Sequence, residues 1–320
     1  MVAASLLAAA AVLPACTGAT DQGQAQVQLP ATGAGTSASP RPRPSATVPT
    51  RSPLALTVAG GAPAASLVGL DRARVVVEYP VAVDRTGLFV LLDTDAGAVG
   101  PLRSATPSDA TLALAFGADL VTARTTGPVV AELRRADLNV VEEHTIPGAL
   151  QRDPTRRAPF NLYAIPAGIR ATLGDRHPST RWPPGDSETG AAQPQDDATV
   201  AATGEVTAIW TWDPAARQWL RAAGGQLEQL ATGERVGAEA IVVVEVPARD
   251  RPPVVADLIG SGAAAVLRDG TVTAGRWTRD DPAMLPTIHG LEAGAPATGT
   301  LWLHVCATPC AALSQPVPTK

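Results

Sequence analysis

The sequence predicts an α+β fold. The N-terminal half has α/β alternation on a mixed sheet, the C-terminal half is mainly antiparallel β, and the two are packed as a layered sandwich. In the first half, strand-like apolar runs alternate with helix start and stop residues, which is typical of α/β units. Beyond Gly204 the helical period is lost, and turn pairs such as Asp213-Pro214 and Asp269-Gly270 separate short apolar runs. Such turns indicate antiparallel strands.

The helix pattern is clearest around Thr106, which we predict to be the N-cap of a helix. Pro107 suits the first helical position, Asp109 suits the positive end of the helix dipole, and Gly117 favours a helix end. The predicted elements of the first half are strands over Val75–Val83 and Gly87–Asp93, a helix over Pro107–Phe116, a strand over Ala118–Ala123, a helix over Gly127–Ala136 and a strand over Asn139–Glu142.

Composition divides the chain into six predicted segments. Of its 320 residues, 45% are hydrophobic, which is enough for one globular unit in two halves. Stretches rich in Pro, Gly, Ser and Gln have too few apolar side chains to offset the entropy of ordering them, so they predict a tether and a linker. The segments are a signal peptide over 1–16, a disordered tether over 17–52, an N-terminal α/β domain over 53–180, a linker over 181–203, a C-terminal β-rich domain over 204–310 and a tail over 311–320.

The N-terminus predicts export and lipid anchoring. Val2 to Leu13 is an apolar run with the length of a signal-peptide core, too short to remain as a membrane helix. Leu13-Pro14-Ala15-Cys16 resembles the lipobox of bacterial lipoproteins, although Pro14 is unusual there and no Lys or Arg precedes the apolar run. We expect Cys16 to be lipidated and the protein to lie at the extracytoplasmic face of the cell membrane. The alternative is an Ala-rich cytoplasmic N-terminus with a buried cysteine.

The net charge of the chain bears on whether it binds nucleic acid. The net charge of -5 and the pI of about 5.4 argue against a broad basic surface, so we expect no nucleic-acid partner.

Cys306 and Cys310 could form a disulfide in an oxidising compartment. Free thiols, or a metal site with His304, remain alternatives, although a structural zinc ion would need a fourth ligand. We expect no metal and no cofactor.

Several sequence blocks together resemble one known family. They are Gly100-Pro101-Leu102-Arg103-Ser104-Ala105, Arg157-Ala158-Pro159-Phe160-Asn161-Leu162-Tyr163, Trp212-Asp213, Gly260-Ser261-Gly262 and Arg268-Asp269-Gly270. In these blocks the chain is similar to the YerB-like lipoproteins, which have paired N-terminal and C-terminal domains of unknown function. The resemblance extends from about Leu54 to Val305. It implies a bacterial surface lipoprotein of mixed α and β fold without an established activity.

The chain departs from this family at positions suited to acid-base chemistry. Gly60-Gly61 stands where the family usually has an Asp-Asn pair, Phe160 replaces a histidine, and Thr122-Ala123 replaces a second histidine. Histidine is the side chain that titrates near neutral pH without perturbation. These departures therefore argue against chemistry that needs a group titrating near neutral pH, and they leave arginine, hydroxyl and amide groups as candidate site residues.

The remaining polar residues predict an anion site. Arg103 and Ser104 precede the first predicted helix, where unpaired backbone N–H groups favour a negative charge. Arg124 precedes the second helix and is expected at the same edge of the sheet. We predict an arginine-lined pocket for a carboxylate or phosphate group. Its candidate residues are Glu78, Arg103, Ser104, Arg157, Asn161 and Tyr163. The alternative is that Arg103 and Arg157 pair with Glu78, Asp153 or backbone carbonyls and only stabilise the fold.

Three tryptophans of the C-terminal half allow two interpretations. Trp210 and Trp212 are two positions apart on a predicted strand and face the same way, with Trp219 beside them on the next strand. Such a row could stack on sugar rings. A position in the core is favoured, because aromatic side chains dominate core burial and this half has few other large side chains.

Two functions remain open. We expect a lipid-anchored binding or scaffold protein of the cell envelope, without catalytic residues, whose partners are the membrane and a cell-wall polymer or envelope assembly proteins. The alternative is an envelope hydrolase or transferase with Glu78 or Asp153 as base, and with Arg103 and Tyr163 stabilising charge.

Overall fold

The computed structural model describes residues 52–60, 66–82, 85–95, 97–175, 192–201, 207–223, 226–247, 258–289, 299–307 and 310. All of them belong to the unit Ser45–Lys320. The predicted signal peptide with Cys16, the predicted tail and nearly all of the predicted tether lie outside the described residues. Within the described ranges, no helix has the length and hydrophobicity that crossing a membrane requires.

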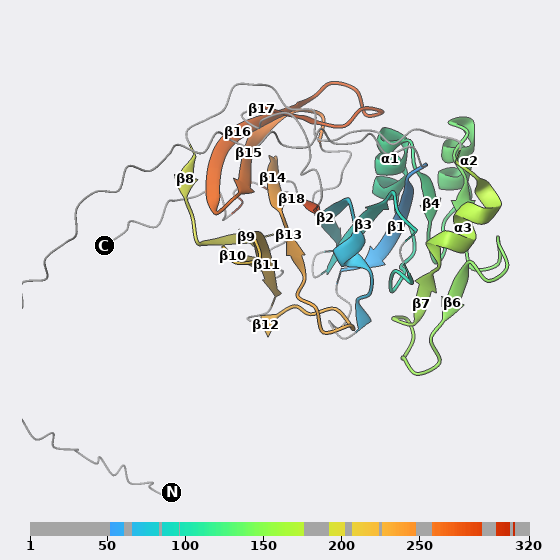
Figure 1. Cartoon of the computed structure of the whole chain (residues 1–320). Coiled ribbons are helices and arrows are strands. Elements are labelled where there is room, and N and C mark those ends of the chain that lie inside the picture. The colour runs from blue at the N-terminus through green and yellow to red at the C-terminus, as the bar shows by residue number, and fades with distance from the viewer. Residues whose placement is uncertain are drawn as a thin grey trace, which may run out of the picture. The chain divides into compact units, whose positions relative to one another are not determined.

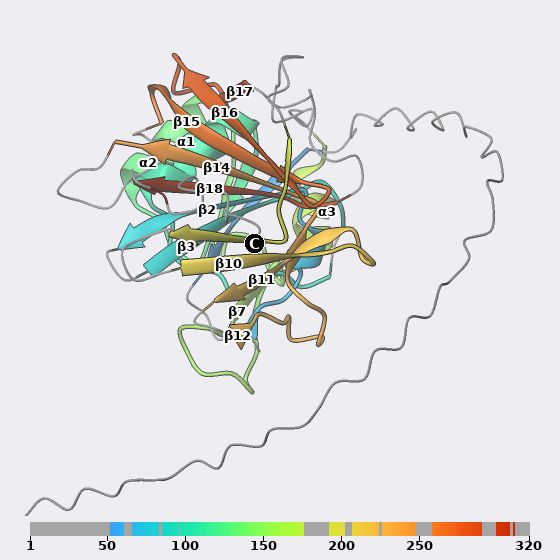
Figure 2. The same cartoon turned by 90° about the vertical axis from the view of Figure 1, so that its left-hand side faces the viewer.

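One mixed sheet of eleven strands is built from both halves of the chain (Figure 1). Its order is β17-β16-β15-β14-β18-β2-β3-β1-β4-β5, and β8 pairs with β16. Figure 2 shows β16, β15, β14, β18, β2 and β3 following one another. These strands are β1 (Leu54–Ala59), β2 (Val75–Ala82), β3 (Arg85–Leu92), β4 (Asp119–Val121), β5 (Val140–Val141), β8 (Gln193–Pro194), β14 (Ala240–Val246), β15 (Gly260–Arg268), β16 (Thr271–Arg279), β17 (Thr287–His289) and β18 (Leu301–Ala307).

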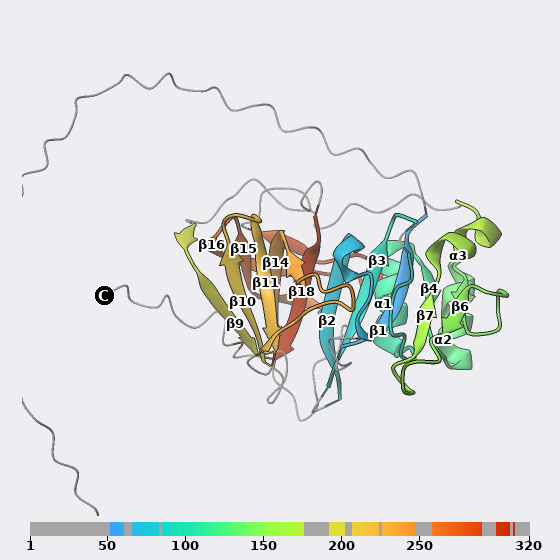
Figure 3. The ribbon, with the colours of Figure 1, turned by 60° about the horizontal axis from the view of Figure 1, so that its bottom comes forward.

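A five-stranded antiparallel sheet packs against one face of the large sheet. Its order is β12-β11-β10-β9, with β13 paired to β11, and Figure 3 shows β9, β10 and β11 lying across β14 and β15. Trp210 and Trp219 from this sheet share one core with Val243 and Trp302 of the large sheet. The strands are β9 (Asp197–Ala201), β10 (Thr207–Asp213), β11 (Gln218–Ala223), β12 (Gln226–Leu227) and β13 (Gly237–Ala238). A separate pair consists of β6 (Leu150–Arg152) and β7 (Leu162–Ala164).

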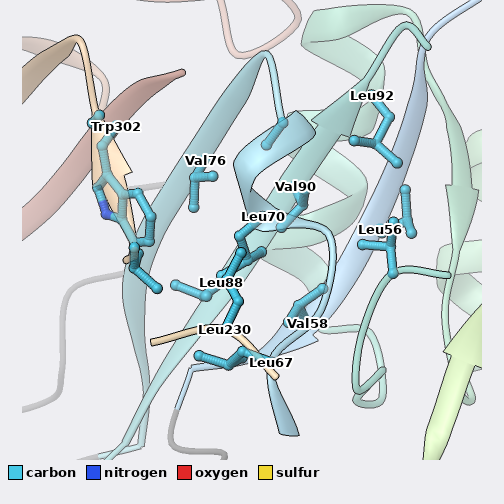
Figure 4. Close-up of a cluster of buried hydrophobic side chains, with 14 of the residues drawn as sticks. Leu56, Val58, Leu67, Leu70, Val76, Leu88, Val90, Leu92, Leu230 and Trp302 are labelled. Atoms are coloured by element: carbon cyan, nitrogen blue, oxygen red, sulfur yellow. The ribbon is translucent and has the colours of Figure 1, made fainter. Parts of the chain in front are cut away.

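Two helices cover the opposite face of the large sheet. Side chains along β2 and β3 alternate between two cores, as the period of a strand requires. Val76 and Val90 belong to the core that contains Trp302 (Figure 4), whereas Phe89 belongs to the core under the helices and stacks on Phe116 with ring centroids 5.8 Å apart. The helices on this face are α1 (Pro107–Phe116) and α2 (Gly127–Arg135). Helix α3 (Pro166–Leu173) packs into the core that contains Trp302. A short 3-10 helix covers Leu70–Arg72.

The start and end of α1 confirm the predicted helix. Asp109 accepts a hydrogen bond of 2.7 Å from the backbone N–H of Thr106, which satisfies a donor that the first helical turn leaves free. Gly117 ends the helix with φ of 60°, a left-handed conformation that glycine adopts without a steric penalty. The cap residues therefore fix both ends of α1 locally.

Strand β18 joins the two halves of the chain. It lies between β14 and β2 and is parallel to both, with Leu301 opposite Val75 and His304 opposite Glu78. The predicted α+β fold is confirmed, and the segments 53–180 and 204–310 share one sheet.

Part of the predicted linker over 181–203 forms strands, so that prediction is wrong over β8 and β9. The segment is rich in Pro, Gln and Asp, and few apolar residues mark the strands. In β9, Ala198 and Val200 nevertheless point inward in alternation and are buried. Antiparallel pairing with β10 supplies the remaining stabilisation. Residues 181–191 lie outside the described residues.

Candidate functional site

A pocket opens beyond the carboxyl ends of β4 and β5. Strands β1, β4 and β5 are parallel, so the residues that follow β4 and β5 meet at one edge of the sheet. The pocket has a volume of about 620 Å³, within the usual range of small-molecule sites. We call it the Arg124 pocket, and it is lined by Ser104, Ala123, Arg124, Glu142, Glu143, His144, Thr145 and Arg152.

Backbone hydrogen bonds hold the loops of this pocket together. The N–H of Ala105 donates to the carbonyl of Arg124 at 2.8 Å, which ties the segment before α1 to the segment before α2. The N–H of Thr125 donates to Glu142 Oε1 at 2.5 Å, which ties the segment before α2 to the turn after β5. Ser104, Arg124 and Glu142 therefore converge from three separate connections.

The charged side chains of the pocket differ in whether they have an ion-pair partner within the protein. Arg152 donates from Nε and Nη2 to the two oxygens of Glu143, at 2.5 Å each. These hydrogen bonds, followed by the charge of Arg152, hold the pKa of Glu143 below its usual range. The side chain of Arg124 is exposed and has no hydrogen-bond or ion-pair partner among the residues that the structure describes. Glu142 has no cationic partner within the same ranges. Arg124 and Glu142 are thus the uncompensated charges of the pocket.

Arg103 lies next to this pocket, but its guanidinium is engaged within the fold. Nη1 and Nη2 donate to the two oxygens of Asp109, at 2.8 Å each, and Nη2 also lies 3.0 Å from the hydroxyl of Tyr79. The side chain of Arg103 is 13% exposed and that of Asp109 is fully buried. Burial disfavours the charged form, but the attraction of Asp109 outweighs it, so the pKa of Arg103 is raised. Arg103 therefore forms a structural ion pair, with Asp109 rather than with Glu78 or Asp153.

Glu78 lies on the other face of the sheet, in a group that we call the junction cluster, formed by Glu78, Thr86, Trp210, Arg221, Trp302 and His304. Glu78 has no exposed surface. Its Oε1 accepts from Arg221 Nη2 at 2.8 Å, and its Oε2 accepts from Trp302 Nε1 at 3.0 Å. Burial raises the pKa of Glu78, but the charges of Arg221 and His304 together with the hydrogen bonds from Thr86 and Trp302 outweigh this effect, so the pKa is lowered. The structure thus separates Glu78 from the other predicted site residues and from any ligand in solvent.

His304 makes the junction cluster sensitive to acid. Its Nε2 accepts from Trp210 Nε1 at 3.0 Å, and burial lowers its pKa to about 4, with Glu78 opposing that shift. In the unfolded chain the pKa is about 6.5, so the unfolded chain binds the proton first as the pH falls. We therefore expect the free energy of unfolding to be unaffected by His304 above about pH 6.5 and to fall by roughly 3 kcal/mol between about pH 6.5 and 4. Urea titrations across this range measure it.

The comparison for this prediction is His304→Gln, whose amide oxygen can still accept the N–H of Trp210. We expect its free energy of unfolding to depend less steeply on pH than that of the parent chain between about pH 6.5 and 4. Equal slopes in the two chains would contradict the assignment of this pH dependence to His304.

The three predicted residues near β7 are not gathered into the Arg124 pocket. The hydroxyl of Tyr163 donates to the carbonyl of Ser66 at 2.9 Å, and its side chain is buried. Asn161 accepts from Arg152 Nη1 at 3.0 Å, so it touches the pocket only through that arginine. Arg157 is exposed on the connection between β6 and β7, without a side-chain partner in the described part of the chain. Of the six predicted residues, Ser104 alone lines the pocket.

The tryptophans and the C-terminal cysteines have structural positions. Trp210 and Trp219 are fully buried, and Trp210 meets Trp302 edge-on with ring centroids 5.2 Å apart. Burial of these rings favours the core interpretation over a sugar-binding platform. Cys306 and Cys310 are joined in a disulfide, so neither sulfur is free to bind a metal together with His304.

Sequence reasoning missed most of the lining residues of the Arg124 pocket. The sequence places Glu142 at the end of a predicted strand and marks neither of the two residues after it as a site residue. Their position directly after β5 was the available indication, because residues that follow parallel strands gather at one edge. Arg152 could not be found in this way, because β6 belongs to a different sheet.

Comparison with known proteins identifies the family. Residues 39–179 match the family model described as the protein of unknown function (DUF3048) N-terminal domain, and residues 198–302 match the corresponding C-terminal domain. The fold resembles the crystal structure of the YerB protein from Bacillus subtilis, with a TM-score of 0.62 and 20% sequence identity over 80% of this chain and 90% of that chain. No curated protein matches the chain. The chain therefore belongs to the YerB-like family, whose members have the paired DUF3048 N-terminal and C-terminal domains.

Proposed function

We propose that the protein is an extracytoplasmic, lipid-anchored, non-catalytic binding protein of the cell envelope, and that it holds an anionic ligand in the Arg124 pocket. The observation that carries this proposal is the guanidinium of Arg124, which lines the pocket without a partner among the described residues. A guanidinium is always charged, and its planar donors match a carboxylate or phosphate group. The ligand would thus supply the partner that the fold does not.

The proposed location rests on the sequence. The apolar run before Cys16 and the polar, Pro-rich stretch after it support a lipid anchor followed by a tether. A protein held in this way meets cell-wall polymers and envelope proteins. Both carry carboxylate or phosphate groups that an arginine could bind. The proposed location and the proposed anionic ligand are therefore consistent with each other.

The alternative, an envelope hydrolase or transferase, has less support. Glu78 is fully buried and paired, so it would not reach a substrate. Asp153 accepts from the hydroxyl of Thr155 at 2.6 Å, and hydrogen bonds from Thr155 lower its pKa. A carboxylate with a lowered pKa is a weak base. Neither predicted base is thus suited to the chemistry that the alternative requires.

Co-sedimentation of residues 17–320 with isolated cell-wall material tests the proposal. We expect the parent chain to bind, and Arg124→Gln to bind about tenfold or more weakly, because a hydrogen bond between charged groups contributes roughly 1.5–3 kcal/mol. Arg157→Gln is the matched control, since Arg157 is exposed and outside the pocket. Absence of binding, or equal binding by both variants, would overturn the proposed site. Release of soluble fragments from the wall material would instead support the enzyme.

A further inference from the structure

We infer that the ligand of the Arg124 pocket is an amino-acid head group that keeps both its α-carboxylate and its α-ammonium free. This inference rests on the proposed function and names the class of ligand. It follows from the pair of opposite charges that remain uncompensated in the pocket, Arg124 and Glu142. A ligand with one negative and one positive group would satisfy both.

The other charges of the pocket already satisfy each other. Arg152 binds both carboxylate oxygens of Glu143, and its remaining terminal nitrogen donates to Asn161. Each of the three guanidinium nitrogens thus has an acceptor within the fold. The Arg152–Glu143 pair thus forms a neutral wall of the pocket, and a ligand gains little by competing with either partner.

The carboxylate of Glu142 is fixed through one oxygen, and its other oxygen has no hydrogen-bond partner among the described residues. Its Oε1 accepts the backbone N–H of Thr125, whereas its Oε2 has no hydrogen-bond partner in the described ranges. A carboxylate can accept several hydrogen bonds, so Oε2 is available to an ammonium group. Thr125 directly follows Arg124 in the chain, so the hydrogen bond to Thr125 places the carboxylate next to the start of the Arg124 side chain. The hydrogen bond therefore fixes the Glu142 carboxylate beside the segment that carries Arg124.

A simple anion would fit this pocket less well. An anion paired with Arg124 would also face the charge of Glu142, and like charges in a partly desolvated site repel each other. An ammonium group on the same ligand converts that repulsion into attraction.

Two kinds of molecule carry this head group. One is a free amino acid, and the other is a residue linked to an envelope polymer through its side chain. Lysine derivatives separate the two sources and the two charges. Nε-acetyllysine keeps both α-groups and imitates the side-chain link, whereas free alanine is the small soluble form. Nα,Nε-diacetyllysine lacks the α-ammonium, and Nε-acetyllysine amide lacks the α-carboxylate; both keep the acetylated side chain, so neither has a second ammonium group. Each probe is titrated into residues 17–320, and the dissociation constant is measured from NMR chemical shifts.

We expect Nε-acetyllysine to bind at least about tenfold more tightly than Nα,Nε-diacetyllysine and Nε-acetyllysine amide, because each of these lacks one charged partner. Free alanine binding as tightly as Nε-acetyllysine would identify a soluble amino acid as the source, and weaker binding would identify a side-chain-linked residue. Glu142→Gln keeps an oxygen for the N–H of Thr125 and removes the charge. We expect this variant to melt at the parent temperature and to bind Nε-acetyllysine and Nα,Nε-diacetyllysine equally.

The outcomes distinguish this inference from the proposed function. If the parent chain binds Nα,Nε-diacetyllysine as tightly as Nε-acetyllysine, and Arg124→Gln weakens both, the anion site stands and the zwitterion inference is overturned. If no lysine derivative or alanine binds while cell-wall material still co-sediments through Arg124, the inference is again overturned and the proposed function remains. If neither the probes nor the wall material bind, both are overturned.

Discussion

An Arg221→Met variant is expected to lose about 3–5 kcal/mol of its free energy of unfolding, because it leaves a buried carboxylate without its ion-pair partner. Arg221 and Glu78 have side chains that are 4% and 0% exposed. The guanidinium also pairs with Glu228 and lies 5.4 Å from the ring centroid of Trp302. Methionine has a similar length and no charge, so the change removes the electrostatic interaction while filling much of the space. Guanidinium chloride titrations measure the loss.

The control for this variant is Arg217→Met. Arg217 donates to Asp269 at 2.7 Å, but the two side chains are 73% and 48% exposed, so we expect a loss of less than about 1 kcal/mol. Adding Glu78→Gln to Arg221→Met removes the unpaired charge and should recover part of the stability. A loss for Arg221→Met no larger than the loss for Arg217→Met would contradict the structural role of the junction cluster.

An Arg103→Gln variant is expected to lose about 3 kcal/mol of its free energy of unfolding, because Asp109 would then keep a buried charge without a cation. Asp109 retains the hydrogen bonds from the hydroxyl of Tyr79 at 2.6 Å and from the N–H of Thr106 at 2.7 Å, which limits the loss. Thermal and chemical unfolding measure it. Arg157→Gln, by contrast, should change the stability by no more than about 0.5 kcal/mol, because its side chain is exposed.

Ligand binding provides a second readout for Arg103→Gln. At a temperature where the variant is folded, we expect it to bind cell-wall material as the parent chain does, because Arg103 does not line the Arg124 pocket. A variant with parent stability that fails to bind would reverse this conclusion and make Arg103 a ligand residue. The two readouts together therefore separate a structural arginine from a binding arginine.

The local elements could be predicted from the sequence, whereas the partners across the fold could not. Cap residues act within one turn, so Thr106, Asp109 and Gly117 were sufficient to place α1. Asp109 also neutralises Arg103, and nothing in the spacing of these two residues distinguishes that pairing from one with Glu78. Long-range pairs such as Arg221 with Glu78, 143 positions apart, depend on how the two sheets pack.

The Arg124 pocket was predicted in part. The rule that residues after parallel strands gather at one edge placed Ser104 and Arg124 together, and both line the pocket. The rule does not extend to Arg157 and Tyr163, because β6 and β7 form a separate pair of strands. Sequence patterns identify strands more readily than they assign strands to sheets, and the composition of a site depends on that assignment.

The central position of β18 affects the order in which the chain can fold as it emerges. A chain that emerges from its N-terminus, whether from the ribosome or across the membrane as proposed above, exposes β2 long before β18, although the two strands are neighbours in the finished sheet. Until β18 has emerged, the edge of β2 is free, and such edges readily pair with other chains. Glu78 likewise lacks its ion-pair partner until Arg221 has emerged. Both halves must therefore emerge before the large sheet is complete, and a chain truncated between them would be prone to aggregation.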